Sequence, residues 1–264
     1  MKTGKVWLFE LVIVALGGCV LIFIVAPLLK MILGTSITDL SAAAYDKQVT
    51  DSIVLTLKCA FFATIISAAG GIPLAYLFAR KRFFGRSLLI AIVDLPVIIP
   101  HCAAGVALFA IIGRNSAIGR MLGGGLIGTP AGISVAMAFV SMPFLVNAAH
   151  QAFSAVPVRL EKAAKTLGAS PGRVFFTISL PLGWRGILSG MVLMWARGIS
   201  EFGAVAIIAY HPMTTPVLIF QRFNDFGLSY AAPAAVLLIL ICIVIFTTLR
   251  IFSAKLQAKE SDRA

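Results

Sequence analysis

The sequence predicts an all-α membrane protein that crosses the bilayer six times, with both termini cytoplasmic. Three observations support this fold class: 60% of the 264 residues are apolar, only 12% are charged, and the cations cluster between long apolar runs. Soluble globular domains do not have this composition. The net charge of +12 also fits nucleic-acid binding, but clustered cations between apolar runs are the signal that sets membrane topology. We therefore expect a lipid environment and no nucleic-acid partner.

Six apolar segments are long enough to span a bilayer, which requires about 20 residues. The first segment is too long for the apolar core of a secretory signal, so we expect a retained helix. The second contains Gly70-Gly71-Ile72-Pro73, which predicts a break near its end. No domain boundary is visible, and we expect a single transmembrane domain over residues 1–264, with spans at about 6–33, 52–79, 88–112, 130–153, 187–209 and 232–252.

The distribution of positive charge predicts the orientation. Fifteen of the 22 Lys and Arg residues fall at the N-terminus, at 80–86, at 159–185 or at the C-terminus, six fall on the other side, and Arg197 lies within a span. Because cytoplasmic loops carry the excess of cations, both termini and the loop at 156–181 are predicted to be cytoplasmic. Six helices in a chain of this length leave little room for a hydrophilic path, which favours an oligomer with the path on its symmetry axis.

The segment 156–181 is the one long polar stretch between apolar runs, with the sequence VPVRLEKAAKTLGASPGRVFFTISLP. Pro157 fits the first position of a helix and Gly168 fits its end. Ser170 fits an N-cap followed by Pro171 at the first position of a second short helix, which we expect to stop at Leu180-Pro181. The segment is therefore predicted to be a helix–turn–helix.

One face of its first helix carries an acid and small residues at helical spacing, namely Glu161, Ala164 and Gly168. Small residues permit close backbone approach, so this face fits a docking surface for a partner protein. The alternative is an ordinary amphipathic loop helix of a multi-spanning protein.

The pattern E-x-A-A-x-x-x-G, followed after a gap by I-x-L-P, resembles the cytoplasmic coupling (EAA) loop of ABC-importer permeases. The matching residues are Glu161, Ala163, Ala164, Gly168, Ile178, Leu180 and Pro181. The resemblance implies that this loop docks in a cleft of an ATP-hydrolysing partner, with Ser170 and Pro171 beginning its second helix. Lys162 stands directly before the two alanines, where many members have Ala and Glu shifted by one position. This departure concerns the register of the contact with the partner and not its existence.

Polar groups inside the predicted spans need a reason, since an ionisable residue there costs about 2.5–3.5 kcal/mol on insertion scales. Asp94 and His101 lie in the third span, where Pro96 and Pro100 predict a kink. Asp94 either has a structural role, pairing with a cation such as Arg80 or satisfying the freed backbone groups, or borders a path. His101 is either a packing residue or a gate residue. Asn147 is expected to form an interhelical hydrogen bond.

The fifth span contains Arg197 and Glu201 at i and i+4, close enough to neutralise each other near mid-membrane. As a structural pair they fix helix packing. As a functional pair, together with Ser200, they border the translocation path.

The stretches ARGISEFGA and DLPVIIPHCAAGVAL resemble the molybdate, tungstate and sulfate branch of the permease family, and IPH resembles its archaeal molybdate/tungstate members. The resemblance implies a type I ABC importer fold and a subunit without catalytic residues. The implied assembly contains two copies of this chain, two ATP-binding cassette subunits that carry ATP and Mg, and an extracytoplasmic oxyanion-binding protein.

Two alternatives remain from the sequence. One is a permease for sulfate or another oxyanion. The other is a proton-coupled secondary carrier that uses Asp94, His101 and Glu201 as a relay and therefore requires them in one cavity. The residues show no protease or hydrolase motif, and the four cysteines lack metal-ligand spacing, so we expect neither an enzyme nor a metal site.

Overall fold

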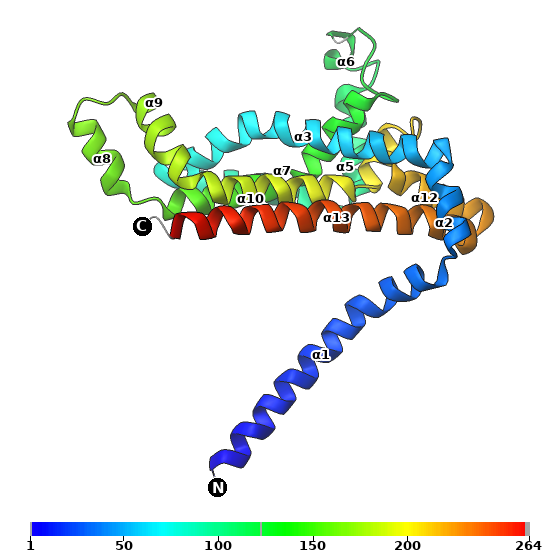
Figure 1. Ribbon diagram of the computed structural model, residues 1–264. Coiled ribbons are helices and arrows are strands. Elements are labelled where there is room, and N and C mark those ends of the chain that lie inside the picture. The colour runs from blue at the N-terminus through cyan, green and yellow to red at the C-terminus, as the bar shows by residue number, and fades with distance from the viewer. Residues whose placement is uncertain (1, 122, 262–264) are drawn as a thin grey trace. The chain divides into compact units, whose positions relative to one another are not determined.

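The computed structural model describes residues 2–121 and 123–261, with side chains described for 9–121 and 123–249. Its elements in order are α1 (Lys2–Gly34), α2 (Ile37–Tyr45), α3 (Lys47–Arg80), α4 (Arg86–Ile98), α5 (His101–Ile112), α6 (Ala117–Met121), α7 (Pro130–Ala155), α8 (Val158–Thr166), α9 (Pro171–Val174), the π-helical segment η1 (Phe175–Ser179), α10 (Leu180–Ile199), α11 (Gly203–Ile208), α12 (Thr215–Phe226) and α13 (Leu228–Ser261) (Figure 1). The described residues contain no strand. The all-α prediction is therefore confirmed.

The chain forms two compact units, one from residues 1–50 and 219–264 and the other from residues 51–218. In the first unit α2 packs against α13, and Arg222 Nη2 donates to Asp46 Oδ2 at 2.5 Å. Burial alone would raise the pKa of Asp46, but hydrogen bonds from Arg222 and from backbone N–H groups hold that pKa below its ordinary value. The side chains of the cations at 2–5 and 250–263, which were used to predict orientation, lie outside the described residues.

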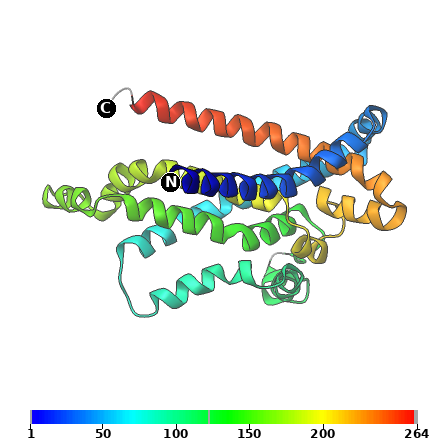
Figure 2. The same cartoon turned by 90° about the horizontal axis from the view of Figure 1, so that it is seen from below.

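The spine of the second unit is the pair α7 and α10, which run side by side in Figures 1 and 2. Glycines make their close approach possible: a Cβ on Gly186 would lie 2.5 Å from the Ala152 Cβ, and one on Gly190 would lie 2.6 Å from the Ala148 Cβ. Inside lipid no hydrophobic driving force acts between helices, so they associate largely through van der Waals packing. Small residues at a crossing permit the close approach that this packing requires. The core of this unit joins α7 and α10 to α3 through Ala75, Phe78, Val146, Ala149, Phe153 and Ile187.

The expected break in the second span is wrong, because α3 continues from Lys47 through Pro73 to Arg80. The glycines serve packing instead. A Cβ on Gly71 would lie 3.3 Å from Val146 Cγ2, so this glycine lets α3 approach α7. A proline removes one backbone hydrogen bond, and membrane helices tolerate it when neighbouring helices satisfy the freed group.

The third predicted span, 88–112, consists of two helices, α4 and α5, which meet at an angle of 111°. Figure 2 shows α4 along its length and α5 nearly end-on. Pro96 lies within α4, and the break falls at the extended Ile99 before Pro100, so the predicted kink is a sharp break. α5 packs against α11, where a Cβ on Gly105 would lie 3.0 Å from the Ala204 backbone.

Among the described residues, five helices are long and apolar enough to cross a membrane, and a sixth span results if the bent α4–α5 pair counts as one. The chain is thus a multi-span protein, and the exact number of six stays a prediction. With the α4–α5 pair counted as the third span, the fifth span covers Pro171–Ile199 rather than the predicted 187–209. Pro181 does not stop this helix, because it lies in the first turn of α10 directly after η1, where a missing N–H is tolerated.

Candidate functional site

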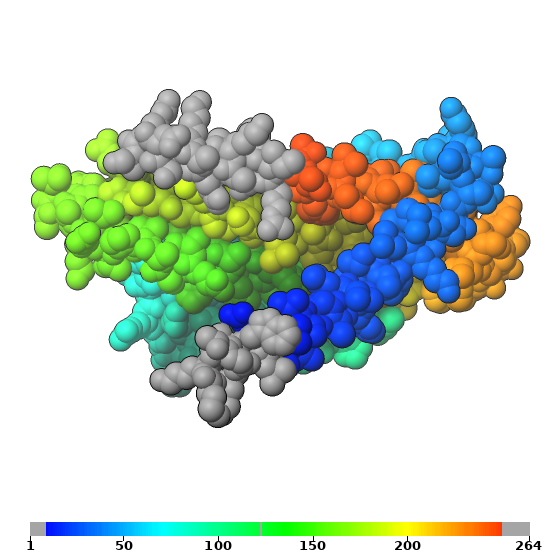
Figure 3. All heavy atoms as spheres, turned by 60° about the horizontal axis from the view of Figure 1, so that its bottom comes forward, coloured from blue at the N-terminus to red at the C-terminus, as the bar shows by residue number. Residues whose placement is uncertain are grey.

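The segment 156–181 forms one end of the second unit, where α8 and α9 project beyond α7 and α10 (Figures 1 and 3). Pro157 occupies the N-cap of α8, and Gly168 ends the helix with a φ of 86°, in the left-handed region that favours glycine. The Ser170 hydroxyl accepts from the Arg173 N–H at 3.3 Å, with Pro171 following at the first position of α9. The predictions for Gly168, Ser170 and Pro171 are confirmed, whereas Pro157 lies one position before the predicted first helical residue, because α8 begins at Val158.

Glu161 points into the protein rather than toward a partner, with only 3% of its surface exposed. Its Oε1 lies 2.6 Å from Arg80 Nε and accepts from the Ser179 hydroxyl at 2.7 Å. Its Oε2 accepts from the Tyr76 hydroxyl at 3.3 Å. Arg80 also donates through Nη2 to the Val156 carbonyl at 3.0 Å. The carboxylate therefore joins α8 to α3 and to η1.

The electrostatics of this cluster favour an ionised carboxylate. Burial alone would raise the pKa of Glu161, but hydrogen bonds from Ser179 and Arg80, together with the Arg80 charge, hold that pKa below its ordinary value. Sequence reasoning missed Tyr76 and Ser179, and it considered Arg80 only as a partner of Asp94. Only the position of Arg80 in the last turn of α3 signalled a role, and nothing in the sequence named its partner.

The outward surface of the segment remains suited to a partner. Of the small residues named from the sequence, Ala163 and Gly168 are exposed and Ala164 is half-buried. Leu167 is 88% exposed in the turn. Four exposed cations surround this surface: Arg159, Lys162, Lys165 and Arg173. The surface thus combines an apolar tip with positive charge.

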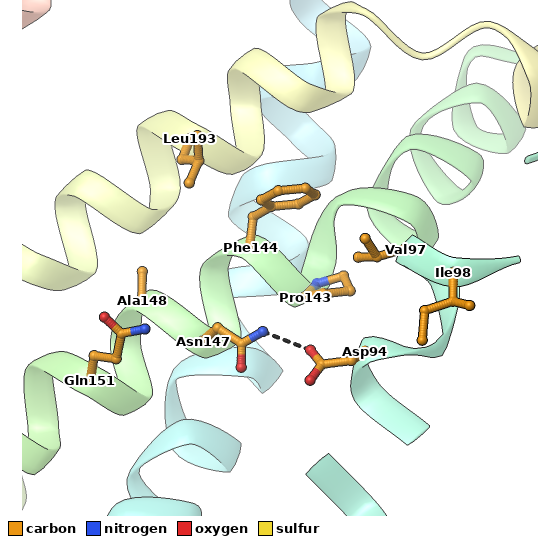
Figure 4. Close-up of a pocket in the computed structure, with 9 residues that line it drawn as sticks. All are labelled: Asp94, Val97, Ile98, Pro143, Phe144, Asn147, Ala148, Gln151 and Leu193. Atoms are coloured by element: carbon orange, nitrogen blue, oxygen red, sulfur yellow. Dashed lines mark hydrogen bonds between the residues drawn. The ribbon is translucent and has the colours of Figure 1, made fainter. Parts of the chain in front are cut away.

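Asp94 lies at the side of a pocket of about 460 Å³ between α4, α7 and α10. Asn147 Nδ2 donates to Asp94 Oδ1 at 2.6 Å, as drawn in Figure 4. The prediction of an interhelical hydrogen bond from Asn147 is confirmed. Arg80, considered as a partner of Asp94, is instead bound to Glu161. Apart from Asp94, Asn147 and Gln151, the lining is apolar: Val97, Ile98, Pro143, Phe144, Ala148 and Leu193.

A second polar cluster forms where two helices break. α10 ends at Ile199 and α11 begins at Gly203, and Glu201 lies in this gap. Its Oε2 lies 3.0 Å from Arg197 Nη2 and 3.1 Å from Nδ1 of His101, the first residue of α5. Its Oε1 accepts from the Ala204 N–H at 3.0 Å. The predicted Arg197–Glu201 pair is confirmed, although it closes across a helix end rather than along a continuous helix.

The structure therefore separates the residues proposed for the path into two places. His101, Arg197, Ser200 and Glu201 share one cluster, since Arg197 Nη1 also donates to the Ser200 hydroxyl at 3.2 Å. Asp94 lies in the other, and neither His101 nor Glu201 lines its pocket. The single cavity that a relay through Asp94, His101 and Glu201 requires does not form here.

Comparison with known proteins agrees with this architecture. Residues 71–258 match the family model described as the binding-protein-dependent transport system inner membrane component. The chain belongs to this family. The match begins within α3 and covers the coupling segment and both polar clusters.

Curated relatives of this transport family extend the match over most of the chain. The molybdate/tungstate transport system permease protein WtpB of Pyrococcus abyssi is 39% identical over 89% of this chain and 92% of its own length. The WtpB protein of Methanocaldococcus jannaschii is 38% identical over 92% of this chain and 96% of its own length. A probable sulfate transport system permease protein, cysT of Chlorokybus atmophyticus, is 34% identical over 71% of this chain and 68% of its own length.

Solved structures show the same fold at low identity. A bacterial ABC transporter involved in the import of the acidic polysaccharide alginate gives a TM-score of 0.73 at 14% identity, covering 98% of this chain and 97% of that one. The MetNI methionine ABC transporter in an inward-facing conformation gives 0.60 at 18% identity, covering 79% and 94%. The transport-family member described here therefore has the fold of an ABC-transporter membrane subunit.

Proposed function

We propose that this chain is the membrane-spanning permease subunit of an ATP-driven importer for molybdate and tungstate. The observation that supports this most strongly is its 38–39% identity, over about nine tenths of its length, to permeases named for those two oxyanions. The sulfate relative is less similar and is matched over a shorter part of the chain. Sulfate is therefore the competing substrate.

The proposed assembly has two copies of this chain, two cytoplasmic ATPase subunits that bind ATP and Mg, and an extracytoplasmic binding protein that delivers the oxyanion. In the proposed topology the chain spans the cell membrane six times with both termini cytoplasmic. The distribution of cations supports it, since four lie at 80–86 around the α3–α4 turn and four at 159–173 in and around α8 and α9.

The segment 156–181 is the proposed contact with the ATPase. Ala163, Gly168, Ser170 and Pro171 lie on its exposed surface, with Ala164 beside them. Glu161 is buried on the inner side of the segment and fixes α8 to the end of α3. A movement of the docked segment is therefore passed directly to a membrane helix. Positioning of the coupling helix is thus its proposed role, in place of direct contact with the motor.

Reconstitution tests this function. The chain is purified with its ATPase and placed in proteoliposomes, and uptake of molybdate, tungstate and sulfate is measured with the binding protein present. We expect uptake of the first two that requires ATP. Uptake by this chain alone under a proton gradient would instead show a secondary carrier, and a preference for sulfate would reassign the substrate.

A further inference from the structure

We infer that the Arg197 guanidinium is a transient contact for the tetrahedral oxyanion on its route through the membrane, with Glu201 and His101 as the residues that position it. This inference rests on the proposed function. It concerns one group of the cluster at the α10–α11 break and assigns the remaining members supporting roles.

The cluster is asymmetric in its exposure. The Glu201 side chain is 0% exposed, whereas 22% of the Arg197 side chain and 33% of the His101 side chain are accessible. Nη2 of Arg197 is occupied by Glu201 and His101 on the buried side, while Nη1 turns toward the exposed Ser200 and lies 3.2 Å from its hydroxyl oxygen. The Nη2 side of the guanidinium is therefore held in place, and the Nη1 side faces the accessible side of the cluster.

The depth of the cluster excludes lipid as its surroundings. Trp195 Nε1 donates to the Leu57 carbonyl at 3.3 Å, and a Cβ on Gly198 would lie 3.3 Å from the Ala60 Cβ. Ala60 is about 20 Å along α3 from its first residue, at 1.5 Å per residue. A hydrocarbon layer of about 30 Å centred on α3 includes this level. An arginine that is partly exposed there faces water or protein, because exposure to lipid is too costly.

The backbone around the cluster indicates a route rather than a plain packing contact. His101 follows the α4–α5 break and Glu201 lies in the α10–α11 break, so two interrupted helices meet at this point. Non-helical backbone at membrane depth is tolerated where it is buried in protein or lines a water-filled cavity. In secondary transporters, substrate sites are typically formed by such discontinuous helices.

The charge of the cluster suits a substrate that must be released. Glu201 neutralises Arg197, so the exposed guanidinium attracts an anion only weakly, and its N–H groups remain able to donate to oxyanion oxygens. The Ser200 hydroxyl oxygen lies 3.2 Å from Nη1, at the position beside the guanidinium that an oxyanion oxygen would occupy. The Asp94 pocket has the opposite character, because its carboxylate would repel the oxyanion.

The test separates an oxyanion contact from a purely structural ion pair. Wild type, Arg197→Gln and the double variant Arg197→Gln/Glu201→Gln are compared as complexes with the ATPase and binding protein in proteoliposomes. A structural pair predicts that the double variant recovers wild-type uptake, because the unpaired buried charge is gone. An oxyanion contact predicts that it does not. We expect molybdate uptake to stay about tenfold below wild type, the equivalent of one charge-assisted hydrogen bond.

Stimulation of ATP hydrolysis by the loaded binding protein is measured in the same samples, so that a loss of the oxyanion contact is distinguished from a failure of the complex to assemble. Recovery of uptake in the double variant, or normal uptake in Arg197→Gln, would overturn the inference. If the double variant does not assemble, Arg197→Lys decides: it keeps the pair with Glu201 but has fewer donors, so several-fold slower uptake supports an oxyanion contact and normal uptake refutes it. Absence of ATP-dependent uptake in wild type would instead reject the proposed function.

Discussion

Arg80 Nε lies 2.6 Å from Glu161 Oε1, and this ion pair joins the last turn of α3 to the middle of α8. Both side chains are almost completely buried, at 8% and 4% exposure. The pair is closed by Ser179 at the end of η1 and by Tyr76 one turn earlier on α3. A segment that reads from the sequence as a docking surface is thus also fixed to the membrane helices by its only acid.

Removing either partner of this pair is expected to weaken the attachment of α8. Glu161→Gln or Arg80→Gln leaves one charge buried without its counter-ion, which costs about 3–5 kcal/mol in buried pairs. We predict fewer oxyanion ions transported per ATP hydrolysed in each variant. The measurement is simultaneous uptake and phosphate release by the reconstituted complex.

The exchanged variant Arg80→Glu/Glu161→Arg tests whether the pairing itself matters. We expect partial recovery of coupling relative to either single variant, because the ion pair can reform with reversed sign. Lys165→Gln serves as the control, since Lys165 is an exposed cation on the same helix. Normal coupling in both single variants would show that the pair does not position α8.

Acid is expected to release the same attachment. The folded-state pKa of Glu161 lies below its ordinary value, which is about 4.3. The contribution to stability is therefore fully present above that value and lost as the pH falls through the lowered pKa. We predict that hydrogen-exchange protection of the α8 amides decreases below about pH 4. Glu161→Gln should show low protection with no such step; an identical step in that variant would assign it to another group.

Local signals in the sequence predicted the caps at Ser170, Pro171 and Gly168, because those residues act through their own backbone. They also placed Arg197 and Glu201 together, since i and i+4 residues are neighbours by geometry. The partners of Glu161 were not predictable in the same way. Arg80 is 81 residues away in the chain, and its choice between Asp94 and Glu161 depends on how α3 packs.

Prolines and glycines were the least predictable features, because the same residue types have opposite outcomes here. Pro73 lies within the continuous helix α3, whereas Pro100 follows a break of 111°. What differs is the surrounding packing: α3 lies against α7 through Gly71, while α5 turns to meet α11 through Gly105. Those contacts are tertiary, and no local pattern in a single sequence reveals them.

Gly168 offers a test of the turn between α8 and α9. Its φ is 86°, and a Cβ there would meet nothing within 4 Å, so the cost of Gly168→Ala is conformational rather than steric. That cost is about 1–2 kcal/mol. We predict weaker binding of the ATPase to Gly168→Ala, measured by co-purification. Gly172→Ala is the control, because Gly172 is helical and also has open space around it. Equal loss in both variants would exclude the turn as the cause.

The close contact between α7 and α10 can be tested by exchanging its two small residues, Gly190 and Ala148. Gly190→Ala places a methyl group 2.6 Å from the Ala148 Cβ, and overpacking of this kind costs about 1–3 kcal/mol. We expect a lower melting temperature in detergent. Gly190→Ala/Ala148→Gly should regain most of the loss, while Gly70→Ala, which meets nothing within 4 Å, should have little effect. No recovery in the double variant would contradict a direct contact.

Asp94 distinguishes an ATP-driven permease from a proton-coupled carrier. Its carboxylate accepts a hydrogen bond from Asn147 at 2.6 Å, and an asparagine at position 94 can still accept this bond through its side-chain carbonyl. For the permease we therefore predict that Asp94→Asn retains ATP-dependent uptake near the wild-type rate. A carrier that passes protons through Asp94 would lose transport, because an amide does not titrate. Asp94→Leu is the matched structural control: it leaves the Asn147 amide without its partner, at a cost of about 1–3 kcal/mol, and should lower the thermal stability of the purified complex. Loss of uptake in Asp94→Asn at unchanged stability would favour the carrier, whereas retained uptake removes Asp94 from any obligatory proton path.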